Sequence, residues 1–180
     1  MPYITLAELA ERPGARELSQ VASPEFKPVV DPALMDATLR SADRSNWDAE
    51  RIAAADDAAR RISDAVAEGD AVIDGFLVQR GYRVPMDPPP TGATKSMLTA
   101  WSRSIARYLL HKHRITEGTK DPIVRDYEDA LKLLGLMAQG RFSLGANDPT
   151  QTGAEGGFNP DVRFEGAPTV FGRDQLRKFR

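Results

Sequence analysis

Apolar side chains recur every three or four residues in three segments of the chain, 54–80, 94–113 and 121–139. This is the period of an α-helix with one buried face. The pattern therefore predicts three amphipathic helices. Their apolar stripes consist of Ile62, Val66, Gly69, Ile73, Phe76 and Leu77 in the first, Leu98, Trp101, Ile105, Tyr108 and Leu109 in the second, and Val124, Tyr127, Leu131, Leu134 and Ala138 in the third.

Start and stop signals predict two shorter helices near the N-terminus. Thr5 and Glu8 have the spacing of a capping box, and Pro13-Gly14 should end that helix after about two turns. Asp31-Pro32 has the form of a second helix start, with proline at the first helical position, and this helix should run to about Ser41. Residues 42–55 are expected to break the chain before the first long helix.

Helices with one apolar stripe must bury those stripes against one another, which produces a bundle. The segment 81–92 is too rich in proline and glycine to be helical, and we expect an extended crossover that Tyr82 and Val84 pin to the bundle. The predicted fold is all-α: a small helical bundle of three main amphipathic helices plus short N-terminal helices, with an extended C-terminal tail. The bundle should occupy residues 1–144, with an inserted linker and helix region at 22–55. Residues 145–180 should form a glycine-rich tether and docking tail.

The composition gives little support to an enzyme. The net charge is −2 and there is no cysteine, which excludes disulfides and thiolate metal sites. The only histidines, His111 and His113, are two apart on a predicted helix, so they point about 200° apart and cannot share a metal. No stretch approaches the about 18 apolar residues that span a bilayer. We therefore predict no catalytic residue, no cofactor, no metal and no membrane partner.

Basic residues are concentrated in one stretch. Residues 91–114 carry five bases and no acids, and four side chains of this stretch share one helical stripe: Arg103, Arg107, His111 and Arg114. One interpretation is a surface that contacts DNA phosphates or an acidic partner subunit. The other is that the stripe faces the acidic helix before it, or solvent.

Three sequence runs in order carry a resemblance to a known family. They are AVIDGFLVQRGYRVPM (Ile73 through Pro85), SIARYLLHKHR (Ile105 through Leu110) and VRDYEDALKLLGLMAQGRFSLG (Arg125 through Leu134, then Gly140 to Gly145). With the Tyr3–Leu9 helix, they resemble the Mu-like prophage family of small head–tail joining proteins. The resemblance implies a homo-oligomeric, dodecameric ring beneath the portal protein, which receives a stopper or tail protein on its other side. It also implies a place in the virion neck after assembly in the host cytoplasm, DNA only as passing cargo, and no catalysis or cofactor.

The C-terminal segment 158–180 has, after Phe158, six further large apolar residues on a basic string: Val162, Phe164, Val170, Phe171, Leu176 and Phe179. Burying six such side chains gives about 9–18 kcal/mol, whereas ordering the segment costs roughly 1–2 kcal/mol per residue for the backbone alone. The segment should therefore need a partner, and its alternative is to fold back on its own bundle or on a neighbour in the ring. We predict portal docking through Phe164, Phe171, Arg173, Leu176, Arg177, Lys178 and Phe179.

Two functions follow as hypotheses. The first is a structural head–tail adaptor, in which Arg103, Arg107 and Arg114 form a face toward another subunit or the channel. The alternative is a small helical DNA-binding protein in packaging or regulation, which would use the same stripe on phosphates.

Overall fold

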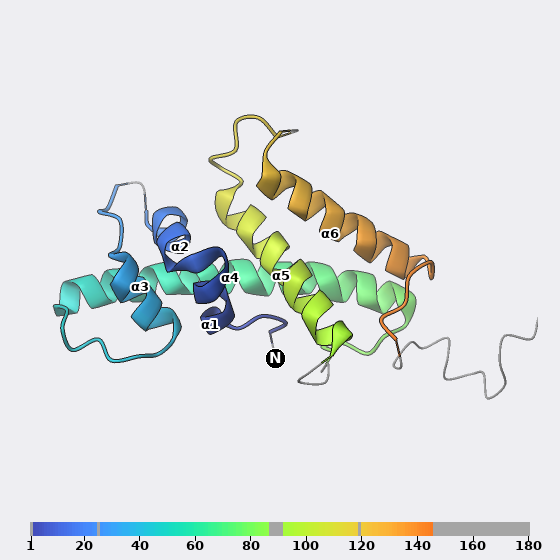
Figure 1. The fold of residues 1–180 in the computed structure, drawn as a ribbon, viewed down its shortest axis with the longest axis horizontal. Coiled ribbons are helices and arrows are strands. Elements are labelled where there is room, and N and C mark those ends of the chain that lie inside the picture. The colour runs from blue at the N-terminus through green and yellow to red at the C-terminus, as the bar shows by residue number, and fades with distance from the viewer. Residues whose placement is uncertain (1, 25, 87–91, 119, 146–180) are drawn as a thin grey trace, which may run out of the picture.

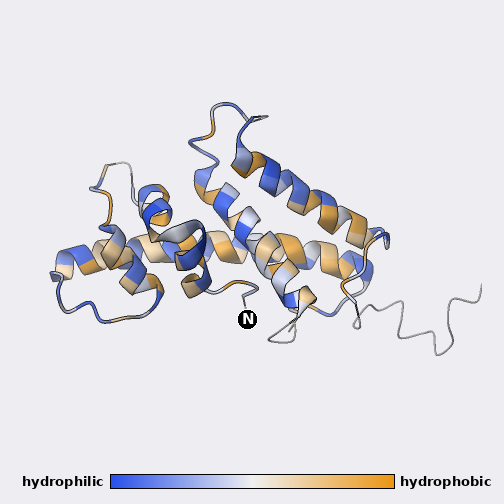
Figure 2. Cartoon of the chain, viewed as in Figure 1, coloured by the Kyte–Doolittle hydropathy of each residue, from blue (hydrophilic) through white to orange (hydrophobic). Residues whose placement is uncertain are grey.

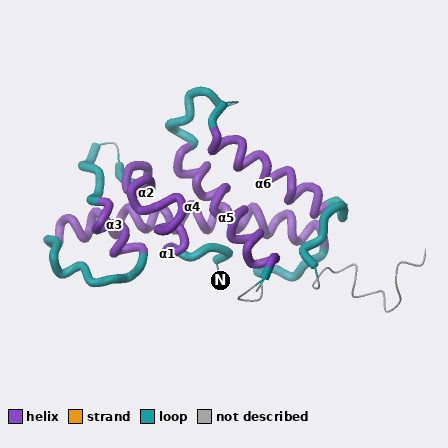
Figure 3. The backbone as a smooth tube through the Cα atoms, viewed as in Figure 1, coloured by secondary structure: helices purple, strands orange, loops and turns teal. Residues whose placement is uncertain are grey.

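The computed structural model describes residues 2–24, 26–86, 92–118 and 120–145. Within these residues the chain forms helices and no strand, which confirms the all-α prediction (Figures 1 and 3). The elements in order are α1 (Leu6–Leu9), a π-helical turn (Ala10–Gly14), α2 (Ala15–Ala22), α3 (Pro32–Leu39), α4 (Ala49–Arg80), α5 (Ala93–His111) and α6 (Pro122–Ala138).

Helix α4 is the long central helix of the bundle and contacts α2, α3, α5 and α6. Its 32 residues give it a length of about 48 Å. Helices α2 and α3 contact its N-terminal part, and α5 crosses it before running beside α6 (Figure 1). The long helix therefore carries both the N-terminal and the C-terminal halves of the molecule.

Two apolar clusters lie along α4, one for each half. The first joins α1, α2 and α3 to α4 through side chains such as Leu9, Leu34 and Ile62. The second joins α4, α5 and α6 through side chains such as Ile105 and Leu134, both fully buried. On α6 the hydrophilic positions lie along the edge turned away from α4 and α5 (Figure 2). Burial of one face of each helix thus builds the core, as the stripes predict.

The three long predicted helices are confirmed, with one shifted boundary. Helix α4 begins at Ala49, so the predicted break at 42–55 is wrong for its second half. The reason is local: the Asp48 side chain caps the helix by accepting a hydrogen bond from the Arg51 N–H at 2.9 Å. At α6, Asp121 accepts from the Ile123 N–H at 2.8 Å, and Pro122 occupies the first turn, as expected.

The N-terminal region contains a helix that the sequence pattern did not predict. The capping box of Thr5 and Glu8 is present, and α3 starts after Asp31 as expected. Pro13-Gly14, however, does not end the helical region. The chain kinks at Arg12 (φ −149°, ψ 117°), passes through Gly14 at φ +112°, and resumes as α2.

The crossover after α4 is partly described. Gly81 ends the helix at φ +93°, a left-handed conformation that glycine adopts without strain. Tyr82 is buried against the second cluster, as predicted, whereas Val84 is 36% exposed and does not pin the crossover. The Thr94 hydroxyl donates to the Leu144 carbonyl at 2.7 Å, which fastens the chain after α6 to the start of α5. The predicted tether and docking tail lie outside the described residues, beyond residue 145, and the domain division at 144/145 stays a prediction.

Candidate partner-binding cleft

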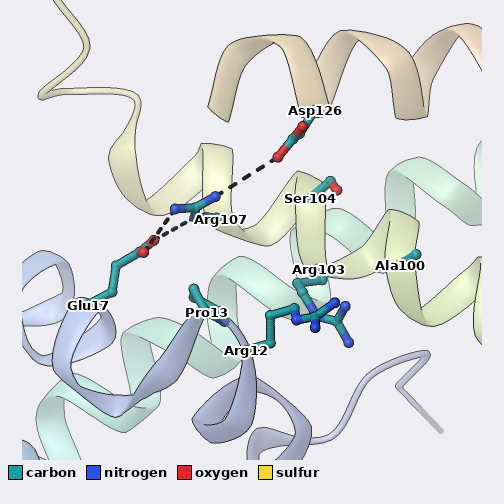
Figure 4. A pocket seen from close by; sticks show the side chains of 8 residues that line it. All are labelled: Arg12, Pro13, Glu17, Ala100, Arg103, Ser104, Arg107 and Asp126. Atoms are coloured by element: carbon teal, nitrogen blue, oxygen red, sulfur yellow. Dashed lines mark hydrogen bonds and ion pairs between the residues drawn. The ribbon is translucent and has the colours of Figure 1, made fainter. Parts of the chain in front are cut away.

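A cleft of about 500 Å³ lies between the N-terminal kink, α5 and the start of α6 (Figure 4). It contains two of the three basic residues predicted as a contact face, Arg103 and Arg107. Arg114 is exposed beyond the end of α5 and does not line it. The lining side chains are Arg12, Pro13, Glu17, Ala100, Arg103, Ser104, Arg107 and Asp126.

The helical period of α5 explains why its basic side chains reach the cleft. Leu98, Ser102 and Ile105 are fully buried on the side of α5 that packs into the core. Arg103 and Arg107 stand one turn apart on the other side. The sequence that builds the core therefore also directs the basic residues away from α4.

Arg107 is held by an acid from the N-terminal half. Its Nε and Nη2 donate to the two carboxylate oxygens of Glu17 at 2.6 and 2.9 Å, a bidentate pair. The His111 ring contacts the same carboxylate at 3.0 Å, and Asp126 lies 4.0 Å from Arg107 Nη1. The alternative interpretation, in which the stripe faces the acidic helix before it or solvent, does not place Arg107 and His111 correctly, because their acid partner is Glu17 of α2.

The pKa shifts agree with a stable ion pair. Burial works against ionisation of Glu17, but hydrogen bonds and charge from Arg107, with a smaller part from His111, outweigh it and lower the pKa of the Glu17 carboxyl. The hydrogen bond to Glu17 in turn raises the pKa of Arg107 against its partial burial. Arg107 thus joins α5 to α2, and its charge is largely neutralised.

Arg103 and Arg12 have no such ion pair. Neither forms an ion pair with another described residue, and their guanidinium groups lie beside each other (Figure 4). The Nε of Arg103 is buried without a hydrogen-bond partner among the described residues. Burial first, and the charge of Arg12 second, lower the pKa of Arg103, while Glu8 opposes this. The Glu8 carboxylate is already occupied by Thr5, whose N–H and hydroxyl donate to it at 2.7 and 2.9 Å.

A second polar centre surrounds Tyr3, which is 2% exposed. The Tyr3 N–H donates to Asp70 at 3.0 Å, its carbonyl accepts from the Thr99 hydroxyl at 2.9 Å, and its own hydroxyl donates to Asp74 and accepts from the Met86 N–H at 3.1 Å. Burial raises the pKa of Tyr3 and of Asp70. These groups satisfy one another, so the centre fastens the N-terminus to α4 and α5. Sequence reasoning missed it because the partners are far apart along the chain.

No group of three or more histidine, aspartate or glutamate side chains among the described residues could hold a metal ion. None of the described helices is both long and apolar enough to cross a bilayer. The predicted portal-docking residues, from Phe164 to Phe179, lie outside the described residues, so their role stays a prediction.

Comparison with known proteins places the chain in a phage family. The family model described as "Bacteriophage Mu, Gp36" matches residues 3–159, a range that includes every described helix and the cleft. A curated relative, "Mu-like prophage FluMu protein gp36" of Haemophilus influenzae, is 31% identical over 120 residues, which cover 66% of this chain and 75% of the relative. The sequence resemblance to Mu-like prophage proteins is thereby confirmed, and the chain belongs to the bacteriophage Mu Gp36 family.

Proposed function

We propose that the protein is a structural head–tail adaptor of a tailed phage, which assembles as a ring under the portal and docks on it through its C-terminal tail. The observation that carries the proposal is the family match over residues 3–159, which spans the whole described fold. In this role the protein works in the virion neck, between the portal and a stopper or tail protein. Phage DNA passes through the ring as cargo.

The described polar centres favour a binding role over catalysis. Glu17 holds Arg107 and His111, and Tyr3 holds Asp70 and Asp74, so both centres are occupied in joining helices. In the cleft, the carboxylates of Glu17 and Asp126 lie against Arg107, while Arg12 and Arg103 form no ion pair with another described residue. A cationic cleft on a rigid helical body is suited to receive an acidic surface. We therefore propose a protein that acts by assembly, without a cofactor.

The tail supplies the contact with the portal in this proposal. Phe164, Phe171, Leu176 and Phe179 would anchor it, while its basic side chains meet acidic portal residues. A peptide that orders only on its partner needs such a pairing of apolar anchors and charges, since ordering the backbone costs roughly 1–2 kcal/mol per residue. The basic residues concerned are Arg173, Arg177 and Lys178.

Truncation after Gly157 tests this role. We expect the full chain to co-sediment with purified portal rings and the truncated chain to lose that binding, with both chains melting at the same temperature by circular dichroism. The triple variant Phe171→Ala, Leu176→Ala and Phe179→Ala should behave like the truncation. Phe26→Ala is a matched control, because Phe26 is an aromatic side chain on the bundle that is 85% exposed. Equal portal binding by full and truncated chains would refute the docking role, and a lower melting temperature after truncation would assign the tail to the core.

The uncompensated Arg12 and Arg103 also favour a second candidate, a DNA-binding protein in packaging or regulation. A phosphate-binding cleft predicts affinity for duplex DNA that falls steeply with salt and is lost in Arg103→Glu. The acids Glu17 and Asp126 inside the cleft argue against it. We expect only weak binding to duplex DNA at physiological salt, with no change in Arg103→Glu, measured by fluorescence anisotropy.

A further inference from the structure

Two opposite faces of the bundle carry opposite charge. The side chains of α5 that line the cleft point away from α4, because the other side of α5 is buried in the core. The exposed stripe of α4 in turn lies opposite its own buried stripe of Ile62, Val66 and Ile73. Because α5 packs on that buried stripe, the cleft lies on the side of α5 away from α4, and the exposed stripe lies on the side of α4 away from α5.

The geometry points to head-to-tail self-association, in which the cleft of one copy receives the Asp64 carboxylate on α4 of a second copy. This inference rests on the proposed ring and names the faces that build it. The receiving groups are the paired guanidiniums of Arg12 and Arg103. The face presented by the second copy is the exposed stripe of α4, which consists of Asp64, Ala67, Glu68, Ala71, Gly75 and Val78.

The cationic side needs an acceptor. Arg12 and Arg103 lie beside each other, and neither forms an ion pair with another described residue; the charge of Glu8 offsets only part of the effect of burial and of Arg12 on Arg103. The buried Nε of Arg103 also lacks an acceptor among the same residues. One carboxylate placed between the two guanidiniums would satisfy both charges and accept several hydrogen bonds. The cleft is therefore incomplete in a single copy.

The acidic side is open and approachable. Asp64 and Glu68 stand one turn apart on α4, both exposed, and neither forms an ion pair with another described residue. The nearby arginines are engaged elsewhere: Arg60 with Asp57, and Arg61 with the Ala22 carbonyl at 3.0 Å. The small residues that follow Asp64 on the stripe leave little side-chain bulk, which permits close approach of a second body.

The surroundings of the cleft favour a protein carboxylate over DNA. Duplex DNA presents one negative charge per about 1.7 Å, so it would meet every charge around the cleft. Those charges include the acids Glu17 and Asp126, which line the cleft itself. A single carboxylate on a helix can enter between the two arginines without meeting all of these acids.

Faces on opposite sides of one body form a heterologous contact. Such a contact repeats from copy to copy and closes into a ring when the rotation between copies allows it. An isologous contact, which pairs one surface with itself, would stop at a dimer. The two cases differ in a directly measurable way.

Charge reversal tests the pairing. We expect Arg103→Glu and Asp64→Arg each to weaken self-association about tenfold or more in sedimentation velocity, and the double variant to recover most of the loss. Arg16→Glu is the matched control, since Arg16 is an exposed α2 arginine that does not line the cleft, and it should leave association unchanged. Far-UV circular dichroism and thermal melts check that each variant folds.

Cysteine cross-linking tests the direction of the contact. The chain has no cysteine, so a variant with Ser104→Cys in the cleft and Ala67→Cys on α4 has only the two introduced thiols. After oxidation we expect a ladder of dimers, trimers and larger species on a non-reducing denaturing gel. Each single variant should give at most dimers.

Three results would overturn the inference. In the first, both charge-reversal variants self-associate as strongly as the wild type. In the second, the full chain stays monomeric up to millimolar concentration. In the third, the double-cysteine variant gives no cross-linked species larger than a dimer. Loss of duplex DNA binding as the only effect of Arg103→Glu would instead make the cleft a phosphate site. Portal binding without a cross-linked ladder would refute the proposed contact between the cleft and α4 but would leave the adaptor role supported. A cross-linked ladder without portal binding would support that contact and refute docking on the portal.

Discussion

Two glycines in the same helix should respond in opposite ways to the same substitution. Gly69 and Gly75 both lie inside α4, where glycine costs about 1 kcal/mol relative to alanine. A Cβ on Gly75 would meet no atom within 4 Å. A Cβ on Gly69 would lie 3.2 Å from Ile105 Cγ2 and 3.6 Å from the Ala106 nitrogen. Of these two glycines, only Gly69 therefore lies where α5 packs closely against α4.

The magnitudes follow from these distances. Gly75→Ala should stabilise the chain by about 1 kcal/mol, the full gain in helix propensity. Gly69→Ala has the same gain but must displace Ile105, which is fully buried, and overpacking of a core typically costs about 1–3 kcal/mol. We expect Gly69→Ala to be neutral or up to about 2 kcal/mol less stable than wild type. The difference between the two variants should be about 1–3 kcal/mol.

Urea unfolding followed by circular dichroism measures both free energies. Low protein concentration is needed, because Gly75 lies on the face proposed to contact a second copy. In a thermal melt the difference corresponds to roughly 2–4 °C per kcal/mol for a chain of this size. If Gly69→Ala proved as stabilising as Gly75→Ala, the close packing of α5 on α4 at this point would be refuted.

Three further substitutions test the polar contacts. Glu17→Gln should destabilise the chain by about 2 kcal/mol at neutral pH, because it leaves Arg107 without its bidentate partner. The pKa of Glu17 is lowered in the folded state, so this contribution is present above the ordinary glutamate pKa and is lost as the pH falls through the folded value. The free energies of unfolding of the wild type and the variant should therefore converge in acid. Tyr3→Phe should cost about 1–3 kcal/mol in urea unfolding, since it leaves the Met86 N–H without its acceptor, and an unchanged free energy of unfolding would show that this hydrogen bond contributes nothing. Asp121→Ala should cost about 1 kcal/mol through loss of the cap at the start of α6, whereas Asp121→Asn should retain most of the stability.

The sequence predicts the elements that are specified locally. The capping box at Thr5, the Asp31-Pro32 start and the Asp121-Pro122 start all form as expected, because each signal depends on residues within one turn. The apolar stripes identify the core faces of α4 and α5 for the same reason; on α6 the predicted stripe contains the buried Leu134 but not the buried Ala130 and Met137.

Other features depend on contacts that no local pattern contains. Helix α2 was missed because Pro13-Gly14 signals a stop, yet burial of Leu18 and Ser19 against the rest of the bundle favours a helix that resumes at once. The sequence pattern identifies the basic stripe, but it does not identify Glu17 as its partner, because Glu17 lies 90 residues from Arg107 along the chain. The sequence did not predict that Arg12 lines the cleft, because its position depends on the kink in the π-helical turn before α2.

The Tyr3 contacts constrain the order in which the chain can mature on a ribosome. Tyr3 bonds to Asp70 and to Thr99, which are 67 and 96 residues further along the chain. Until those partners have left the exit tunnel, these hydrogen bonds of Tyr3 cannot form, so its closure over α4 and α5 must follow synthesis of α5. Contacts between such distant residues slow folding. The segment around Tyr3 is therefore synthesised before the residues that fix it in place.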